Sequence, residues 1–317
     1  MAVPGIAKRH DTAPAALIIS AMHSDPILPD IRFAADTAAE HRFAFAGEDA
    51  VPCRYLAGNA DPEAWRVGPD FRFIALRAGE TGDLVADTRR LYTGLLAQVR
   101  GSSHPYLIRI WNYFADINRG DEDAERYRQF CVGRAQAVDA EFNDPPPAAT
   151  AIGSPRDDGL RVIALCSNRP AVALENPRQT PAWQYPRQYG RVSPGFSRGA
   201  VLNAGSAAPV LLASGTASIV GHASVHIGDT AEQCRESLRN LQALLDEGER
   251  RCGARFRFAD CRALRVYVRD PAEIDTVRAV FETGGIPPRH IVYLHGDVCR
   301  RELAVELEGV FPADCSG

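Results

Sequence analysis

Apolar residues recur every three or four positions in several segments of the chain, and shorter apolar or alternating runs separate these segments. The first spacing is typical of amphipathic helices and the second of strands. Helices are predicted over residues 86–99, 121–138, 230–248 and 272–284. Strands are predicted over residues 106–117, 160–168, 263–274, 290–294 and 303–310, and within 207–225. This order of elements predicts an α+β fold, in which the helices pack on one face of a sheet.

The order helix, strand, helix occurs twice, which indicates a diverged internal duplication. The segment IRIWNYFADI (108–117) aligns with RVYVRDPAEI (265–274), and both segments end in an acidic residue followed by Ile. In this alignment their apolar residues run in the same phase. The repeated unit is far longer than the roughly 20–50 residues of a solenoid repeat, so we interpret it as a whole α+β unit.

Two irregular stretches divide the chain. Residues 142–159 are rich in Pro, Gly and Asp, which extend neither helix nor strand. They predict two domains, residues 1–150 and 160–317, with strand 160–168 opening the second. Residues 176–199 combine prolines and arginines with aromatic residues. Long loops in compact domains are either functional or disordered, and the aromatic side chains favour an ordered functional loop.

The end of the chain is predicted to form a hairpin, with strands 290–294 and 303–310 around a turn at Gly296 and Asp297. In the closing strand, successive side chains point to opposite faces of the sheet. One face carries Leu303, Val305 and Leu307, and the other carries Ala304, Glu306 and Glu308. The simplest interpretation of two carboxylates on one face is that this face is solvated. The alternative is that one of them lines a pocket.

Composition narrows the classes of function. The 317 residues are 45% hydrophobic, which is enough for a core, and carry a net charge of −4. The absence of a basic run argues against nucleic-acid binding, and no apolar run approaches the ~20 residues of a membrane helix. The segment MAVPGIAKRH lacks the apolar core of a secretory signal, so we expect a cytoplasmic protein. The eight cysteines form no CxxC pair, and no metal is expected.

Arginine supplies nearly all the positive charge, because Lys8 is the only lysine. The planar guanidinium matches a carboxylate at two points, so the chain is well equipped to bind a small organic anion. Arg126 and Arg134 are eight residues apart and share a helical face. Arg187 and Arg198 lie in the aromatic loop. Each alone is expected at the surface, whereas several near one glutamate would form a dicarboxylate pocket with that glutamate as acid or base.

Two further positions allow more than one interpretation. Gly215, within SGTAS, marks either a β-bulge or a close approach of the backbone to another group. Cys299 follows His295 in a predicted turn, but no nucleophile elbow accompanies them, so a Cys/His hydrolase is less favoured. The chain has neither GxGxxG after a strand nor GxxxxGK[ST], which leaves nucleotide binding without support.

The second half resembles the RidA/YjgF fold in its SxG strand, a Q-x6-N-L helix and the closing strand AVELEGV. The chain as a whole resembles the chorismatases more closely. The motifs that carry this resemblance are, in order, YLIRIWNYFADIN, ERYRQFCVGR, NPRQTPAWQYPRQYG, SPGFSRG, SGTAS and CRRELAVELEG. They span residues 100–310, and the first hundred residues carry little of the resemblance.

Chorismatases act on chorismate, a cyclohexadiene with a ring carboxylate and an enolpyruvyl ether, and expel pyruvate. The resemblance implies that Glu306 is the acid that protonates the enolpyruvyl methylene carbon, in a closed apolar pocket that raises its pKa. It also implies that Gly215 and Cys299 mark the branch that aromatises the ring to 3-hydroxybenzoate, with Cys299 assisting at the ring. A related subtype, linked to pigment and ubiquinone supply, gives 4-hydroxybenzoate as well.

The remaining expectations concern the substrate's two carboxylates and the alternatives. Tyr113 and Arg269, at the ends of the duplicated strands, join Arg126, Arg134, Arg187 and Arg198 as candidates for holding these carboxylates. No cofactor is implied, and a homotrimer and a monomer both remain open. The competing functions are a RidA-like enamine or imine deaminase, a chorismate hydrolase that yields a dihydroxycyclohexadiene carboxylate, and a non-catalytic binder of aromatic acids.

Overall fold

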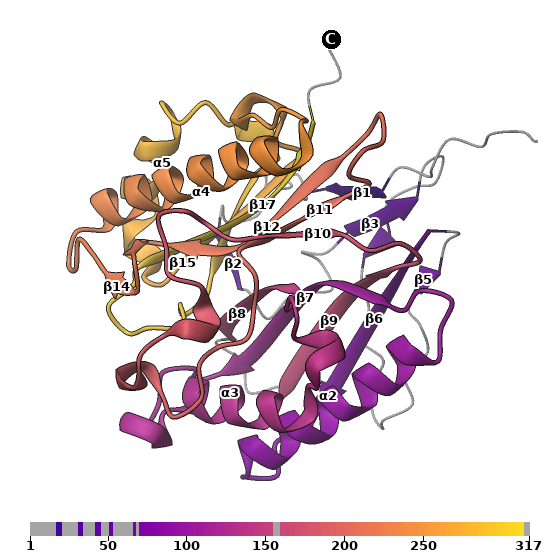
Figure 1. The fold of residues 1–317 in the computed structure, drawn as a ribbon. Helices are drawn as coiled ribbons and strands as arrows, with labels where there is room; N and C mark the ends of the chain where they lie inside the picture. The colour runs from indigo at the N-terminus through magenta and orange to yellow at the C-terminus, as the bar shows by residue number, and fades with distance from the viewer. Residues whose placement is uncertain are drawn as a thin grey trace, which may run out of the picture.

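The chain forms four layers, with two β-sheets facing each other and a pair of helices outside each sheet (Figure 1). The computed structural model describes residues 70–154 and 159–313, together with the backbone of five short strands that precede them. These strands are β1 (Leu17–Ser20), β2 (Ile31–Phe33), β3 (Arg42–Phe45), β4 (Val51–Pro52) and β5 (Arg66–Val67). Within the described residues, no helix is both long and apolar enough to cross a bilayer.

The first sheet has the strand order β5-β6-β9-β7-β8, and helices α2 and α3 cover its outer face. Its elements are β6 (Phe71–Ala78), α2 (Leu84–Arg100), β7 (Tyr106–Ala115), α3 (Arg126–Ala137), β8 (Ala148–Ser154) and β9 (Leu160–Ser167). Helix α2 begins where the Asp83 carboxylate accepts a hydrogen bond from the Ala86 N–H, which satisfies an otherwise free donor. Its apolar stripe, including Leu95, packs on Ile110 and Phe114.

The second sheet has the strand order β10-β11-β12-β17-β15-β16-β2, with helices α4 and α5 on its outer face. Its elements are β10 (Val172–Leu174), β11 (Gly199–Leu202), β12 (Val210–Ala217), α4 (Thr230–Cys252), β15 (Ala263–Val268), α5 (Ile274–Phe281), β16 (Ile291–His295) and β17 (Val305–Pro312). Leu241 and Leu245 of α4 pack on Val266. A separate core, which includes Trp111 and Leu212, joins the inner faces of the two sheets.

The two halves repeat one topology, which confirms the predicted internal duplication. In the first sheet, the order β6-β9-β7-β8 has two antiparallel pairs followed by a parallel one. In the second sheet, the order β12-β17-β15-β16 has the same directions. Each half is therefore an α+β, RidA/YjgF-like unit with its helices on one face of its sheet.

The predicted placement of strand 160–168 at the start of the second domain is wrong. That strand is β9, which pairs with β6 and β7 and is the first-half counterpart of β17. Strand β8 lies inside the Pro/Gly/Asp-rich stretch, so this stretch does not mark the boundary. A strand buried on both faces has the same apolar pattern in either sheet, and the pattern therefore could not assign it.

The strand order at the end of the chain and the phase of the duplicated strands also differ from the prediction. The C-terminal hairpin does not form, because β15 lies between β16 and β17 in the sheet. The aligned segments 108–117 and 265–274 are out of phase, since Trp111 faces the core between the sheets whereas its aligned partner Val268 packs on the helix side. A one-residue slip exchanges the two faces of a strand, and strands buried on both faces conceal it.

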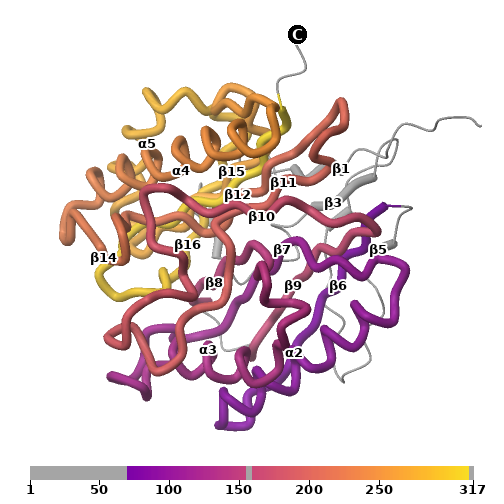
Figure 2. The backbone as a smooth tube through the Cα atoms, viewed as in Figure 1, coloured from indigo at the N-terminus to yellow at the C-terminus, as the bar shows by residue number. Residues whose placement is uncertain are grey.

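Two connecting segments bring the halves together at the carboxyl end of β7. The helix predicted over 121–138 starts as a 3₁₀ turn, η1 (Glu122–Ala124), and α3 follows it. The loop 176–199 leaves the second sheet after β10, passes beside α3 and returns to the second sheet at β11 (Figure 2). It contains two further turns, η3 (Ala182–Gln184) and η4 (Arg187–Tyr189). Arg187 pairs with Asp123 at 2.6 Å, which ties this loop to the first half.

Candidate active site

Strand β17 points two carboxylates into the space between the sheets. Within β17 the predicted alternation is confirmed, because Val305 and Leu307 face the helices while Val310 faces the other sheet with the acidic residues. The prediction is wrong for the two residues before the strand, since Ala304 packs with the helix-side core and Leu303 lies in a separate cluster. Glu306 is 4% exposed and Glu308 is 1% exposed. The interpretation of this face as solvated is therefore wrong, and each carboxylate needs its own explanation.

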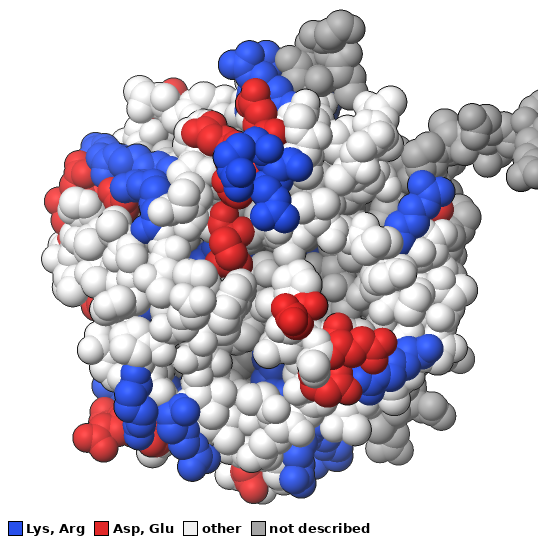
Figure 3. Space-filling model, in the orientation of Figure 1, with Lys and Arg blue, Asp and Glu red and all other residues white. Residues whose placement is uncertain are grey.

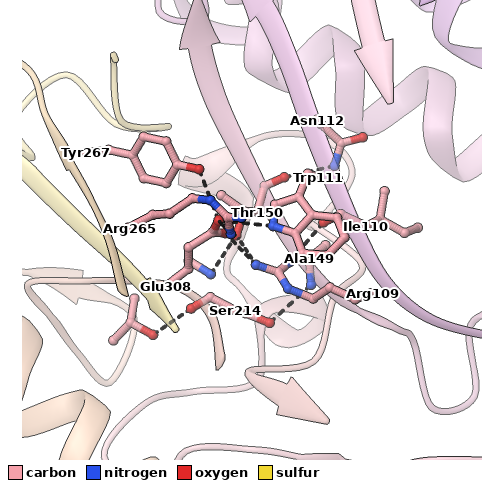
Figure 4. Close-up of polar contacts among 12 residues, drawn as sticks. Arg109, Ile110, Trp111, Asn112, Ala149, Thr150, Ser214, Arg265, Tyr267 and Glu308 are labelled. Atoms are coloured by element: carbon pink, nitrogen blue, oxygen red, sulfur yellow. Dashed lines mark hydrogen bonds and ion pairs between the residues drawn. The ribbon is translucent and has the colours of Figure 1, made fainter. Parts of the chain in front are cut away.

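Glu308 is held by five side chains drawn from both halves (Figure 4). They are Arg109 at 2.6 Å, Trp111 at 3.0 Å, Thr150 at 2.5 Å, Arg265 at 2.9 Å and Tyr267 at 3.0 Å. Burial by itself would raise the pKa of Glu308, but the two guanidinium groups outweigh it and hold the pKa below its usual value. Glu308 is thus an ionised structural residue at the junction of the sheets.

Glu306 has the opposite environment. Among the described residues, none donates a hydrogen bond to its carboxyl group, which borders a cavity. Burial and the negative charge of Glu308 raise the pKa of Glu306 to about 8. Its carboxyl lies directly against Gly215, where an added Cβ would come within 2.0 Å of Glu306 Oε1. Glycine is therefore required at position 215 for the carboxyl to occupy this place.

The cavity has a volume of about 490 Å³, which is within the usual range for small-molecule sites. Both halves line it. The first half contributes η1, α3 and β8, and the second contributes the aromatic loop, β12, the 299–302 turn and the start of β17. Of the residues predicted for the site, Glu306, Cys299, Gly215, Arg134 and Arg198 line this cavity. The duplication therefore places the candidate acid at the contact between its two copies.

Two buried arginines supply positive charge to the cavity. Arg198 donates hydrogen bonds through Nη2 to the Tyr185 hydroxyl at 2.7 Å and to the Thr180 carbonyl at 3.0 Å. Arg134 lies over the Tyr92 ring, with 5.7 Å between Cζ and the ring centroid. Guanidinium groups fixed in this way can bind carboxylates with little further loss of side-chain freedom.

Four other predicted residues do not line the cavity, and the expectation that they hold the substrate is not supported. Arg126 instead bonds the Ala115 carbonyl and Glu80. Tyr113 is fully buried and shares a hydrogen bond of 3.0 Å with Tyr267. The other two are Arg187, an exposed partner of Asp123, and Arg269, which bonds Asp297 and the carbonyls of Leu303, Val298 and Arg300. The guanidinium groups of the three arginines fasten loops, a use that residue type alone does not reveal.

Cys299 lines the cavity as a neutral thiol. Burial and the neighbouring Glu306 raise the pKa of Cys299 to about 12, so it is not a thiolate at neutral pH. His295 does not line the cavity, and the Cys/His hydrolase has no support in the geometry.

In the part of the chain that the structure describes, no three His, Cys, Asp or Glu residues group as metal ligands. On the face shown in Figure 3, acidic and basic side chains are interspersed.

Sequence reasoning missed several residues that line the cavity. Tyr127 lies in α3, and burial raises its pKa well above the usual value. Arg300 stacks on the Tyr189 ring, 3.9 Å from its centroid. Thr150 lies in β8 and bonds Glu308. Only the order of aromatic and basic residues in YRQF and CRRE could have indicated the first two, and Thr150 carries no local signal.

Comparisons with known proteins point to one family. The family model described as "Chorismatase FkbO/Hyg5-like, N-terminal" matches residues 52–166, which end within β9. A chorismatase of Streptomyces rapamycinicus is 40% identical over 264 residues, covering 80% of this chain and 78% of the relative. A 3-hydroxybenzoate synthase of Streptomyces hygroscopicus is 37% identical over 264 residues, covering 80% of this chain and 77% of the relative.

A solved structure agrees with these relatives. The crystal structure of a chorismatase matches this fold with a TM-score of 0.76 at 32% identity, covering 93% of this chain and 92% of that one. At this coverage the agreement extends over both halves. The chain therefore belongs to the chorismatase family.

Proposed function

We propose that the chain converts chorismate to a hydroxybenzoate and pyruvate, with Glu306 as the proton donor. The observation that carries this proposal is a buried carboxyl group, free of hydrogen bonds from described residues, that faces a cavity whose lining includes two buried arginines. With a pKa of about 8, Glu306 is mainly protonated at neutral pH and can act as an acid. The relatives named chorismatase and 3-hydroxybenzoate synthase support the choice of substrate.

In the first step, Glu306 transfers its proton to the methylene carbon of the enolpyruvyl group. The C=C bond becomes a methyl group attached to an oxocarbenium carbon, and Glu306 becomes a carboxylate. A fixed negative charge beside the cation that forms stabilises the transition state. Arg134 and Arg198 are the candidates for binding the two carboxylates of chorismate, because both line the cavity and both are buried.

The second step determines the product. We propose that the oxygen of the neighbouring ring hydroxyl bonds to the ring carbon that carries the pyruvate oxygen, and that the bond from this carbon to the pyruvate oxygen breaks. The bond from the hydroxyl oxygen to its original ring carbon then breaks, and the carbon that now bears the hydroxyl loses its proton to Glu306, which makes the ring aromatic. Chorismate then divides into 3-hydroxybenzoate and pyruvate without consuming water, and the glutamic acid is regenerated. Gly215 and the neutral Cys299 thiol favour this outcome by resemblance to the aromatising branch. A portion of 4-hydroxybenzoate is compatible with the same site.

Incubating the purified protein with chorismate tests the proposal. Pyruvate should appear in a lactate dehydrogenase assay, and chromatography should show mainly 3-hydroxybenzoate, with the two hydroxybenzoates together equal in amount to the pyruvate. Glu306→Gln should lower kcat roughly 100- to 10,000-fold with little change in KM, because a proton transfer is lost while the shape remains. In the wild type, kcat/KM should fall as pH rises through about 8, where the acid ionises. Full turnover by the Gln variant would remove Glu306 from the mechanism.

A chorismate hydrolase is the second candidate, because it would use the same acid in the same cavity. Hydrolysis consumes one water and leaves a dihydroxycyclohexadiene carboxylate, which chromatography separates from both hydroxybenzoates. The third candidate is a deaminase, which would release ammonia from enamines or imines and would leave chorismate unchanged. Pyruvate release from chorismate therefore excludes the deaminase, and the identity of the ring product decides between the other two.

A further inference from the structure

Thr150 connects the buried Glu308 cluster to the cavity. Its hydroxyl donates to Glu308 Oε2 and accepts hydrogen bonds from the Gly215 backbone N–H at 2.9 Å and from Arg109 Nη2. A hydroxyl has one hydrogen to donate and two lone pairs that accept, so this one is fully used. Thr150 is 3% exposed, which leaves no role for solvent in satisfying these groups.

The Gly215 amide depends on Thr150 because the β12–β17 ladder is interrupted at this point. Ala213 pairs with Gly309 and Thr216 pairs with Leu307, so β12 has one more residue than β17 between these pairs. Such a β-bulge leaves backbone groups without partners in the ladder. At this bulge the first half supplies the partner of the Gly215 N–H, which donates to the Thr150 hydroxyl, whereas the Ser214 N–H donates to the Arg198 carbonyl of the second half. Strand β8 also holds the Ser214 side chain, since the Ala149 N–H donates to Ser214 Oγ at 3.1 Å.

The bulge in turn determines where the Glu306 carboxyl can lie. Glu306 Oε1 would be only 2.0 Å from a Cβ at position 215, so the carboxyl lies against the backbone of the bulge. A movement of this backbone by a fraction of an ångström would displace the carboxyl or open it to water. Catalytic groups need placement to within about 0.5 Å, so a displacement of this kind is sufficient to affect proton transfer.

We propose that Thr150 is a positioning residue that ties the β12 bulge to the Glu308 cluster and thereby fixes Glu306 for proton transfer. This inference rests on the proposed function in one respect, the role of Glu306 as acid. Thr150 acts through Gly215 and not on the substrate. A strand of the first half thus places the acid that lies on a strand of the second half.

The test compares Thr150→Val, which keeps the shape and removes the hydroxyl, with Thr150→Ser, which keeps the hydroxyl. Thr150→Val should lower kcat roughly 10- to 100-fold with KM changed less than about threefold, because orientation and not substrate binding is lost. Thr150→Ser should restore kcat to within about threefold of the wild type. The same kcat loss in both variants, or normal kcat in Thr150→Val, would overturn the inference.

Tyr267→Phe provides a matched control for damage to the cluster. It also removes one hydroxyl from Glu308, but it leaves the bond between Thr150 and Gly215 intact. It should lower the melting temperature about as much as Thr150→Val while changing kcat less than about threefold. If both variants lose kcat equally, the cluster acts only through stability and the positioning role is wrong.

A readout without substrate separates this inference from the proposed function. Infrared difference spectroscopy can follow the C=O stretching band of a protonated carboxyl as a function of pH. The band that belongs to Glu306 is the one that the Glu306→Gln variant lacks. In the wild type it should disappear as pH rises through about 8. In Thr150→Val the midpoint should fall by at least about half a pH unit as the released bulge admits water, whereas Thr150→Ser should keep it. An unchanged midpoint in Thr150→Val contradicts the inference even if chorismate proves not to be the substrate.

Discussion

At the scale of single residues, the pKa values of two glutamates on one face of β17 are shifted in opposite directions. Glu308 has five donors and two guanidinium groups, and its pKa is lowered. Glu306 has burial and a neighbouring negative charge, and its pKa is raised to about 8. The same residue type therefore serves as a structural anion at one position and as a candidate acid two residues earlier.

Glu306 should reduce stability at alkaline pH. Its pKa is about 8 in the folded chain against 4.5 when exposed, so between these values the folded state binds more protons than the unfolded state. The free energy of unfolding therefore falls as pH rises through this interval. Glu306→Gln cannot ionise, and its melting temperature should exceed that of the wild type by an amount that grows from about pH 5 to about pH 9. Circular dichroism against temperature measures this, and a constant difference would contradict it.

Gly215→Ala should displace the Glu306 carboxyl. The added Cβ would meet Oε1 at 2.0 Å, and real contacts of this kind do not occur. We expect kcat to fall at least about 10-fold while the fold is retained, because the carboxyl can rotate toward the cavity. Pyruvate release measures the effect, and Gly205→Ala, where no atom lies within 4 Å of the new Cβ, controls for glycine replacement. Because Gly205 has a φ of +79°, alanine is strained there and Gly205→Ala can lower stability. The kcat values of the two variants are therefore compared per amount of folded protein.

At the scale of elements, the loop 176–199 carries arginines with different tasks. Arg198 is 3% exposed and lines the cavity, whereas the Arg187 side chain is 67% exposed and pairs with Asp123 at the surface. Exposed ion pairs contribute little, about 0–1 kcal/mol, while a buried charge-assisted bond to a ligand contributes more. The two residues lie in one loop and therefore form a matched pair for experiment.

Arg198→Ala should raise KM for chorismate roughly 10- to 100-fold, because a charge-assisted contact with the ligand is lost. Arg187→Ala should change KM less than about threefold. Initial rates of pyruvate release over a range of chorismate concentrations give both values. The assignment of Arg198 to the substrate would be wrong if the two variants behaved alike.

At the scale of the whole molecule, each half supplies buried contacts to the other. Three of the donors to Glu308, namely Arg109, Trp111 and Thr150, belong to the first half. The apolar core between the sheets also takes side chains from both. We propose that the structural units are residues 70–167 and 172–313, which divide after β9. Separation would expose this core and leave Glu308 buried with fewer partners.

Residues 169–317 expressed alone should therefore lack a cooperative unfolding transition. Removing partners from a buried charge costs about 3–5 kcal/mol, a large part of the stability of an ordinary domain. Near-ultraviolet circular dichroism during heating measures this, and mixing with residues 1–168 should restore the transition. A cooperative transition in the isolated fragment would show that the second half is an independent domain.

The sequence by itself determined the features that depend on local pattern. Helical spacing predicted α2 and α4, the duplication followed from the repeated order of elements, and alternation placed Glu306 and Glu308 on one face of β17. The order of the motifs indicated the family before any geometry was known. These features survive because side-chain periodicity and motif order are properties of neighbouring residues.

Only the tertiary structure decided the features that depend on distant residues. It assigned β9 to the first sheet, separated β16 from β17, and showed which arginines reach the cavity. It also showed that Thr150 and Glu308 meet across 158 residues of sequence. An arginine has the same letter whether it binds a substrate, a loop carbonyl or a surface carboxylate. The partner of an arginine is determined by packing between the two halves. Contacts of this kind produce no periodic pattern in the sequence.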